Sequence, residues 1–166
     1  MPEKQTLERA REDAREGKSP STQAGEFVKE EMDHIREGKH GARSTKQAIA
    51  IGLSKARRAG VKLPPPKKGK TSEATRQKAE RDVSTARKPA EKKSAKRSRA
   101  VENALQREGH SAASHAALSK QARQAARQRG SAARKQAAKK AARTKGPAER
   151  SLAARKAART RARRAA

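Results

Sequence analysis

The feature that most constrains this chain is how few large apolar side chains follow residue 63. Over the last 103 residues only five remain: Val83, Val101, Leu105, Leu118 and Leu152. Most of the other hydrophobic residues there are alanines, which bury little area. Low hydrophobicity combined with high charge leaves too little burial to offset chain entropy. We therefore expect no compact core in the tail, residues 71–166, and only a small one in the head, residues 1–63.

The charge is divided along the same line. Residues 1–66 hold 14 basic and 10 acidic residues, a net of +4, whereas residues 67–166 hold 31 basic and 7 acidic residues, a net of +24. A chain segment of this kind repels itself and is attracted to polyanions. The most abundant polyanion in a cell is nucleic acid, and duplex DNA carries one charge roughly every 1.7 Å.

The head contains the clearest secondary-structure signals. Helices are predicted over residues 6–16, 20–37 and 45–59, each followed by a glycine. Ser44 and Gln47 fit a capping box at the start of the third helix. Residues 64–70 are a Pro/Lys linker that stiffens the exit from the head.

The second and third predicted helices should pack as a hairpin. Apolar side chains recur with helical spacing on both, so Phe27, Val28 and Ile35 are expected to meet Ile49 and Leu53. The core is small and its stability marginal. Self-association of the head is an alternative use of its remaining apolar surface, and we favour simple exposure.

The tail is predicted to be largely disordered or to form extended helices rich in Ala, Lys and Arg, which makes the whole chain all-α. Breakers near residues 89, 109, 130 and 146 divide it. Strong helix propensity competes with repulsion between like charges at i,i+4 spacing. Neutralisation by phosphate removes the repulsion, so we expect the tail to change from coil to helix when it binds.

Little in the sequence suggests catalysis, a metal or a cofactor, and we expect no enzyme. There is no cysteine, no phosphate-binding loop and no zinc-finger spacing. His34 and Glu37, at i,i+3, are a weak metal pair, and exposed histidines at helix ends are the simpler interpretation. The carboxylates between Glu26 and Glu37 are interpreted as a solvated face, with counter-ions for the tail as the alternative.

The near absence of aromatic residues indicates the mode of nucleic-acid binding. Single-strand binders and RNA-recognition sheets stack bases on aromatic rings, and this chain has one Phe and neither Tyr nor Trp. Phosphate neutralisation by Lys and Arg remains, and duplex DNA is the expected partner. The candidate contacts are Lys46, Lys55, Arg57 and Arg58 in the head, Lys67, Lys68 and Lys70 in the linker, and Lys92, Lys93, Lys96, Arg97, Arg99, Arg123, Arg127, Arg129, Arg134, Lys135, Lys139, Lys140, Arg143, Lys145, Arg155, Lys156, Arg159, Arg161, Arg163 and Arg164 in the tail.

The third predicted helix also carries a resemblance. Residues 46–60, KQAIAIGLSKARRAG, resemble a family of small, basic bacterial proteins of uncharacterised function that share a KQAIAIxLSxARxAG core and are often labelled DNA-binding. The resemblance covers 25 to 40 residues and implies no active site. In composition alone, the tail is similar to linker-histone C-terminal tails and to the Lys/Ala-rich tails of some bacterial nucleoid proteins.

Three functions remain open on the sequence alone. The first is a histone-like, nucleoid-associated protein of the cytoplasm that binds DNA without sequence preference. The second is a basic protein associated with RNA or the ribosome. The third is a protein-interaction module whose charge is incidental. No apolar stretch approaches a membrane-spanning length, and we expect no membrane partner.

Overall fold

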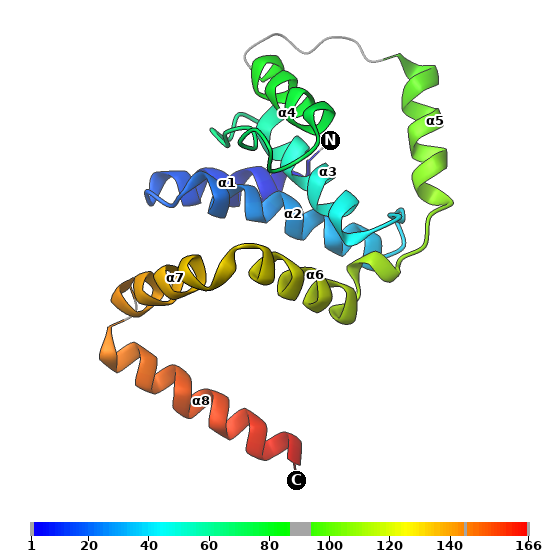
Figure 1. Ribbon diagram of the computed structural model, residues 1–166. Coiled ribbons are helices and arrows are strands. Elements are labelled where there is room, and N and C mark those ends of the chain that lie inside the picture. Colours follow the sequence, from blue (N-terminus) through cyan, green and yellow to red (C-terminus); the bar gives the residue numbers. More distant parts are fainter. Residues whose placement is uncertain (1, 87–93, 145, 166) are drawn as a thin grey trace. The chain divides into compact units, whose positions relative to one another are not determined.

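The computed structural model describes residues 2–86, 94–144 and 146–165, with side chains up to Arg163 (Figure 1). All the secondary structure in these residues is helical, which confirms the all-α prediction. The prediction that the tail is largely disordered is wrong, because its described residues are mostly helical, and its extended-helical alternative holds. The helices are α1 (Lys4–Arg15), α2 (Pro20–Arg36), α3 (Thr45–Arg58), α4 (Glu73–Thr85), α5 (Ala95–Gln106), the 3-10 turn η1 (Ser111–Ala113), α6 (His115–Gln128), α7 (Gly130–Thr144) and α8 (Pro147–Ala165).

Repulsion between cations does not prevent these tail helices. Their alanines, lysines, arginines and glutamines favour the helix at nearly every position. The opposing i,i+4 pairs each cost only a few tenths of a kcal/mol. The structure therefore gives no support to a change from coil to helix on binding.

Helices α1, α2 and α3 form the core of the head, with α2 packed against both of the others (Figure 1). Phe27 is fully buried beside Ala24 and Ala56, with Leu53 packed against this group. Ile35 is buried in a second group, against which Val28 and Ile49 pack. The predicted helical hairpin and its facing side chains are therefore confirmed.

The turn between α2 and α3 is built as the sequence suggested, with one difference. Gly38 adopts a left-handed conformation, with φ of 76°, and reverses the chain after α2. The Ser44 hydroxyl accepts a hydrogen bond from the Gln47 amide at 3.2 Å. The Gln47 side chain reaches back to the amide of Arg43, at 3.0 Å, one residue earlier than in a standard capping box.

Helices α2 and α3 approach closely at Gly52. A Cβ atom at this position would lie 2.7 Å from Val28 Cα and 3.0 Å from Phe27 O. Any side chain there would push against the backbone of α2. The glycine therefore sets the distance between the two helices, and with it the separation of the polar side chains they carry.

Part of the tail belongs to the same compact unit. The Gly41 amide donates to Leu105 O at 2.9 Å and the Ala42 amide to Gly109 O at 3.1 Å. Ala112 and Ala113 are buried in the group around Ile35, and Leu118 packs against it. The tail was expected to form no compact core of its own; this segment instead adds two small buried side chains to the core of the head.

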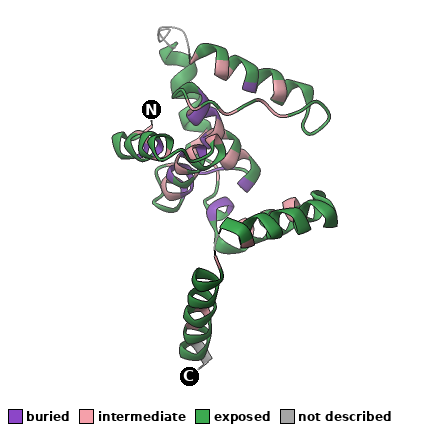
Figure 2. Cartoon of the chain, turned by 90° about the vertical axis from the view of Figure 1, so that its left-hand side faces the viewer, coloured by how far each residue is buried: buried purple, intermediate pink, exposed green. Residues whose placement is uncertain are grey.

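The chain divides into two compact units, Met1–Gln121 and Ala122–Ala166. The first extends well beyond the predicted end of the head at residue 63. In the second, α7 and α8 are almost entirely exposed, whereas buried residues lie in the first unit (Figure 2). None of the described helices is both long enough and apolar enough to cross a bilayer.

Candidate nucleic-acid interface and polar centre

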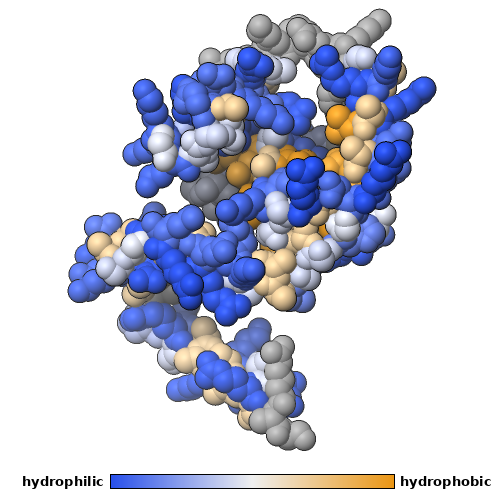
Figure 3. Space-filling view, turned by 45° about the vertical axis from the view of Figure 1, so that its right-hand side comes forward, coloured by the Kyte–Doolittle hydropathy of each residue, from blue (hydrophilic) through white to orange (hydrophobic). Residues whose placement is uncertain are grey.

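Most of the cations predicted to bind phosphate are exposed. In the head and linker these are Lys46, Lys67, Lys68 and Lys70, and α5 adds Lys96, Arg97 and Arg99. Figure 3 shows hydrophilic residues interspersed with more apolar ones over α8, at the bottom of the view. Lys92, Lys93, Lys145 and the Arg164 side chain lie outside the described residues. The exposed candidates between residues 122 and 163 are Arg123, Arg127, Arg129, Arg134, Lys135, Lys139, Lys140, Arg143, Arg155, Lys156, Arg159, Arg161 and Arg163.

Two of the predicted head cations are instead paired with carboxylates. Lys55 Nζ lies 2.6 Å from Glu31 Oε2 and 3.5 Å from Glu30 Oε1, on a side chain that is only 18% exposed. Arg58 Nε lies 3.5 Å from Asp82 Oδ1, and this guanidinium also donates to Ser54. Their contacts with phosphate remain predictions, and a phosphate at either side chain would compete with these carboxylates.

Arg57 is also withdrawn from solvent. Its guanidinium donates to the carbonyl oxygens of Leu63 at 3.4 Å and Pro64 at 3.3 Å, which holds the start of the linker against α3. Burial lowers the pKa of Arg57, and the charge of Asp82 opposes that shift. Only 8% of the surface of Arg57 is exposed, and its hydrogen bonds stabilise the end of the head. Its contact with phosphate remains a prediction.

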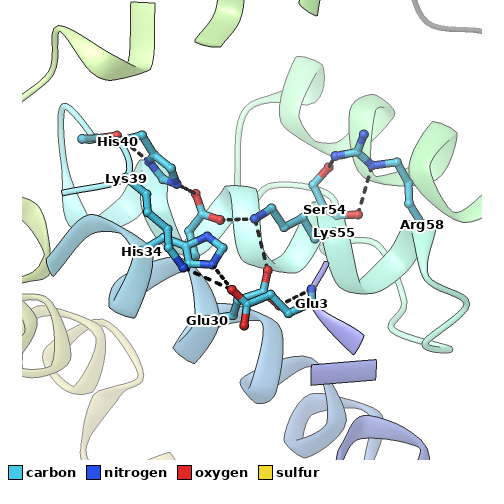
Figure 4. A network of polar contacts seen from close by, with 10 residues as sticks. Glu3, Glu30, His34, Lys39, His40, Ser54, Lys55 and Arg58 are labelled. Atoms are coloured by element: carbon cyan, nitrogen blue, oxygen red, sulfur yellow. Dashed lines mark hydrogen bonds and ion pairs between the residues drawn. The ribbon is translucent and has the colours of Figure 1, made fainter. Parts of the chain in front are cut away.

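Two of the carboxylates predicted to form a solvated face, Glu30 and Glu31, are buried instead. Glu30 is 5% exposed and Glu31 is 1% exposed, and both form ion pairs with Lys55 on α3. Figure 4 shows the Glu30 side chain pointing toward Lys55. Taking carboxylates out of water is costly unless they are paired. The counter-ion for these two comes from the head's own third helix.

His34 and His40 lie beside these carboxylates, contrary to the prediction of exposed histidines. His34 Nε2 is 2.9 Å from Glu3 Oε1, and His40 Nε2 is 3.4 Å from Glu31 Oε1 (Figure 4). The side chains are only 14% and 17% exposed. The two rings lie edge to face with their centroids 6.0 Å apart. By contrast, His110 and His115 are exposed, as expected.

Glu3 ties the start of α1 to this group. Its backbone amide donates to Glu30 Oε2 at 3.2 Å, and its side chain also contacts Lys39 Nζ at 3.2 Å. Hydrogen bonds from His34 and then Lys39 lower the pKa of Glu3. We name the polar centre as Glu3, Glu30, Glu31, His34, Lys39, His40 and Lys55.

The polar centre could not be predicted from the sequence, because its members come from four separate segments. The sequence pattern paired His34 with Glu37, whereas the fold places His34 near Glu31, one helical turn earlier, and near His40. One signal was present: His34 and His40 are separated by five residues, within the spacing seen for zinc-binding histidines.

The comparisons with known proteins are restricted to the head and linker. Residues 15–68, about a third of the chain, match a family of unknown function, DUF6496. The matched stretch contains α2 and α3 and all of the polar centre except Glu3. No curated protein and no solved structure matches the chain.

Proposed function

We propose that this chain binds duplex DNA without sequence preference, through phosphate contacts made mainly by the cations of residues 122–166. The observation that carries the proposal is the composition and exposure of this unit. It holds 16 basic residues and one acidic residue, Glu149, a net of +15 in 45 residues. Among its residues with described side chains, every Lys and Arg is exposed.

The arrangement of these cations on their helices supports contact with phosphates. Lys135, Lys139 and Arg143 form one row at i,i+4 spacing, and Arg155, Arg159 and Arg163 form another. Further cations lie on the other sides of α7 and α8, so neither helix has an apolar face that could pack in a core. Binding to phosphate relieves the repulsion within each row.

Sequence preference is not part of the proposal. Reading bases requires side chains placed against base edges in a groove, and phosphate contacts carry no such information. Histone-like, nucleoid-associated proteins of the bacterial cytoplasm work in this way, and we place the chain among them. Association with structured RNA is the alternative, because phosphate contact alone does not distinguish the two polymers.

The test is the salt dependence of binding to a random DNA duplex, measured by fluorescence anisotropy. The logarithm of the affinity falls with the logarithm of salt concentration, with a slope of about −0.9 per phosphate contact. A variant with five substitutions in α7 replaces Arg134, Lys135, Lys139, Lys140 and Arg143 with Gln. We expect weaker binding, and a slope that is shallower by up to about 4.5 if all five make contacts.

A charge-matched control removes five exposed cations from the head instead. It replaces Lys4, Arg11, Arg15, Lys29 and Lys62 with Gln, so both variants lose the same net charge. We expect the control to keep most of the wild-type slope. Equal losses of affinity and of salt slope in the two variants would show that total charge, rather than residues 122–166, governs binding. Stronger competition by structured RNA than by DNA would favour the RNA alternative.

A further inference from the structure

The polar centre contains a set of donor atoms suited to a metal ion. Glu31, His34 and His40 each place one donor atom within 4.8 Å of the other two. Glu31 and His34 are one turn apart on α2, and the left-handed turn at Gly38 brings His40 back beside them. We infer that these three side chains bind a divalent transition metal of the zinc class, as a site with two imidazole ligands and one carboxylate.

The spacing of the donor atoms is close to that of a coordinated site. Zinc lies 2.0–2.1 Å from nitrogen and oxygen ligands, so the donors of a tetrahedral site are about 3.4 Å apart. His40 Nε2 and Glu31 Oε1 are already 3.4 Å apart. The remaining pairs, at no more than 4.8 Å, need side-chain movements of at most about 1.4 Å to reach this spacing.

Groups around the donors are placed as the outer shell of a metal site requires. Histidine ligands usually hold their second ring nitrogen against a carboxylate or a backbone carbonyl. His40 Nδ1 lies 3.1 Å from Gly41 O, and His34 Nε2 lies 2.9 Å from Glu3 Oε1. When each of these nitrogens carries the proton, the other nitrogen of the ring has a lone pair for the metal.

Glu31 is the donor with the most unused capacity. Both of its carboxylate oxygens are buried, and Oε1 accepts no hydrogen bond from the described residues, whereas Oε2 lies 2.6 Å from Lys55 Nζ. Lys55 forms an ion pair with Oε2, which orients the carboxylate and directs Oε1 toward His40. A buried carboxylate with only ionic partners can still accept a cation.

Charge and ligand chemistry both favour a transition metal. With neutral imidazoles, the three carboxylates of the polar centre outnumber its two lysines, which leaves a net charge of −1 inside a chain of +28. Two imidazole nitrogens favour zinc, cobalt, nickel or copper over magnesium or calcium, which prefer oxygen. Three protein ligands leave a fourth position for water.

The test is titration of the full-length chain with Zn²⁺ alone, by isothermal titration calorimetry in high salt after nuclease treatment. We expect one tight equivalent. His34→Ala and His40→Ala should weaken it by more than the 10- to 100-fold typical of changes outside the ligand shell. His115→Ala is the matched control, because this exposed histidine lies outside the site, and it should bind as the wild type does.

A gain-of-signal variant keeps the test decisive if an alanine variant fails to fold by circular dichroism. His40→Cys supplies a thiolate, and Co²⁺ bound there should show a sulfur-to-metal charge-transfer band that the wild type lacks. A structural role for His40 would produce no such band. The inference is overturned if the wild type binds no tight equivalent, if folded His34→Ala and His40→Ala bind as tightly as it does, or if Co²⁺ gives no thiolate band.

Discussion

Helices α2–α3 and helices α7–α8 both contain lysines and arginines, but the two regions differ in whether these side chains are paired within the chain or exposed to solvent. On α3, Lys55 and Arg58 are held by carboxylates, and Arg57 is held by backbone carbonyls. On α7 and α8, no cation with a described side chain forms an ion pair, and all are exposed. These three cations of α3 make contacts that stabilise the fold, whereas the cations of α7 and α8 with described side chains are exposed to solvent.

The largest expected effect comes from removing the ammonium that serves the buried carboxylates. Lys55→Met leaves Glu30 and Glu31 without their cation, and breaking a buried pair in this way costs about 3–5 kcal/mol. We expect a loss of stability at the lower end of that range, because Lys55 is partly exposed. Urea unfolding of the variant and the wild type measures this difference in the free energy of unfolding.

Lys139→Met is the matched change in the other region. Lys139 is exposed on α7, so the same substitution should change stability by no more than about 0.5 kcal/mol. If Lys55→Met were as mild as Lys139→Met, the distinction between structural and available cations would fail.

The next effect concerns the distance between α2 and α3. Gly52→Ala places a methyl group against the backbone of Val28 and Phe27, and we expect a loss of about 1–3 kcal/mol as the helices separate. Gly25→Ala is the control, because a Cβ there meets nothing within 4 Å. Gly25 is also within a helix, so that change should stabilise the protein by about 0.5–1 kcal/mol. Thermal denaturation of both variants separates packing from helix propensity; a stabilised Gly52→Ala would show that the close approach is not needed.

Helix caps give a smaller effect. Ser44→Ala removes the hydroxyl that accepts from the Gln47 amide, and we expect a loss of about 1 kcal/mol in urea unfolding. Ser94 caps α5 at a longer distance of 3.5 Å, and α5 has no buried residue in the described structure. Ser94→Ala should therefore leave the global unfolding free energy nearly unchanged. Equal losses would show that α5 unfolds together with the head.

The smallest expected effect is a change in helix content when DNA binds. The described residues of α7 and α8 are helical without a partner, so the far-ultraviolet circular dichroism of the full chain should already show strong helicity. Adding duplex DNA should change it little. A large increase in helical signal would show that these helices depend on their ligand.

Features with a local cause could be predicted from the sequence. Helical spacing placed Phe27 and Ile35 opposite α3, and Ser44 marked the start of that helix. The pairing of Lys55 with Glu31 could not be predicted, because it joins two helices whose separation is set by the contact at Gly52. Charge alone gave Lys55 the same expected role as any tail lysine.

The packing of residues 105–118 was missed for a different reason. Much of the contact between this segment and the head is made by backbone atoms, as in the hydrogen bond between Gly41 and Leu105. Backbone contacts of this kind cannot be recognised from amino-acid composition. Ala112 and Ala113 look like any other alanines of the tail, yet they are buried. Identical residues therefore differ in role because of what lies opposite them.

The hydrogen bond between the Gly41 amide and Leu105 O also makes the intervening chain a closed ring. For a flexible ring, the entropic penalty of closure grows only with the logarithm of its length. An insertion of ten residues at Gly69, in the exposed linker, would lengthen this ring by about a sixth and raise that penalty by only about 0.1 kcal/mol. The linker should therefore tolerate an inserted segment without loss of the hydrogen bond between Gly41 and Leu105.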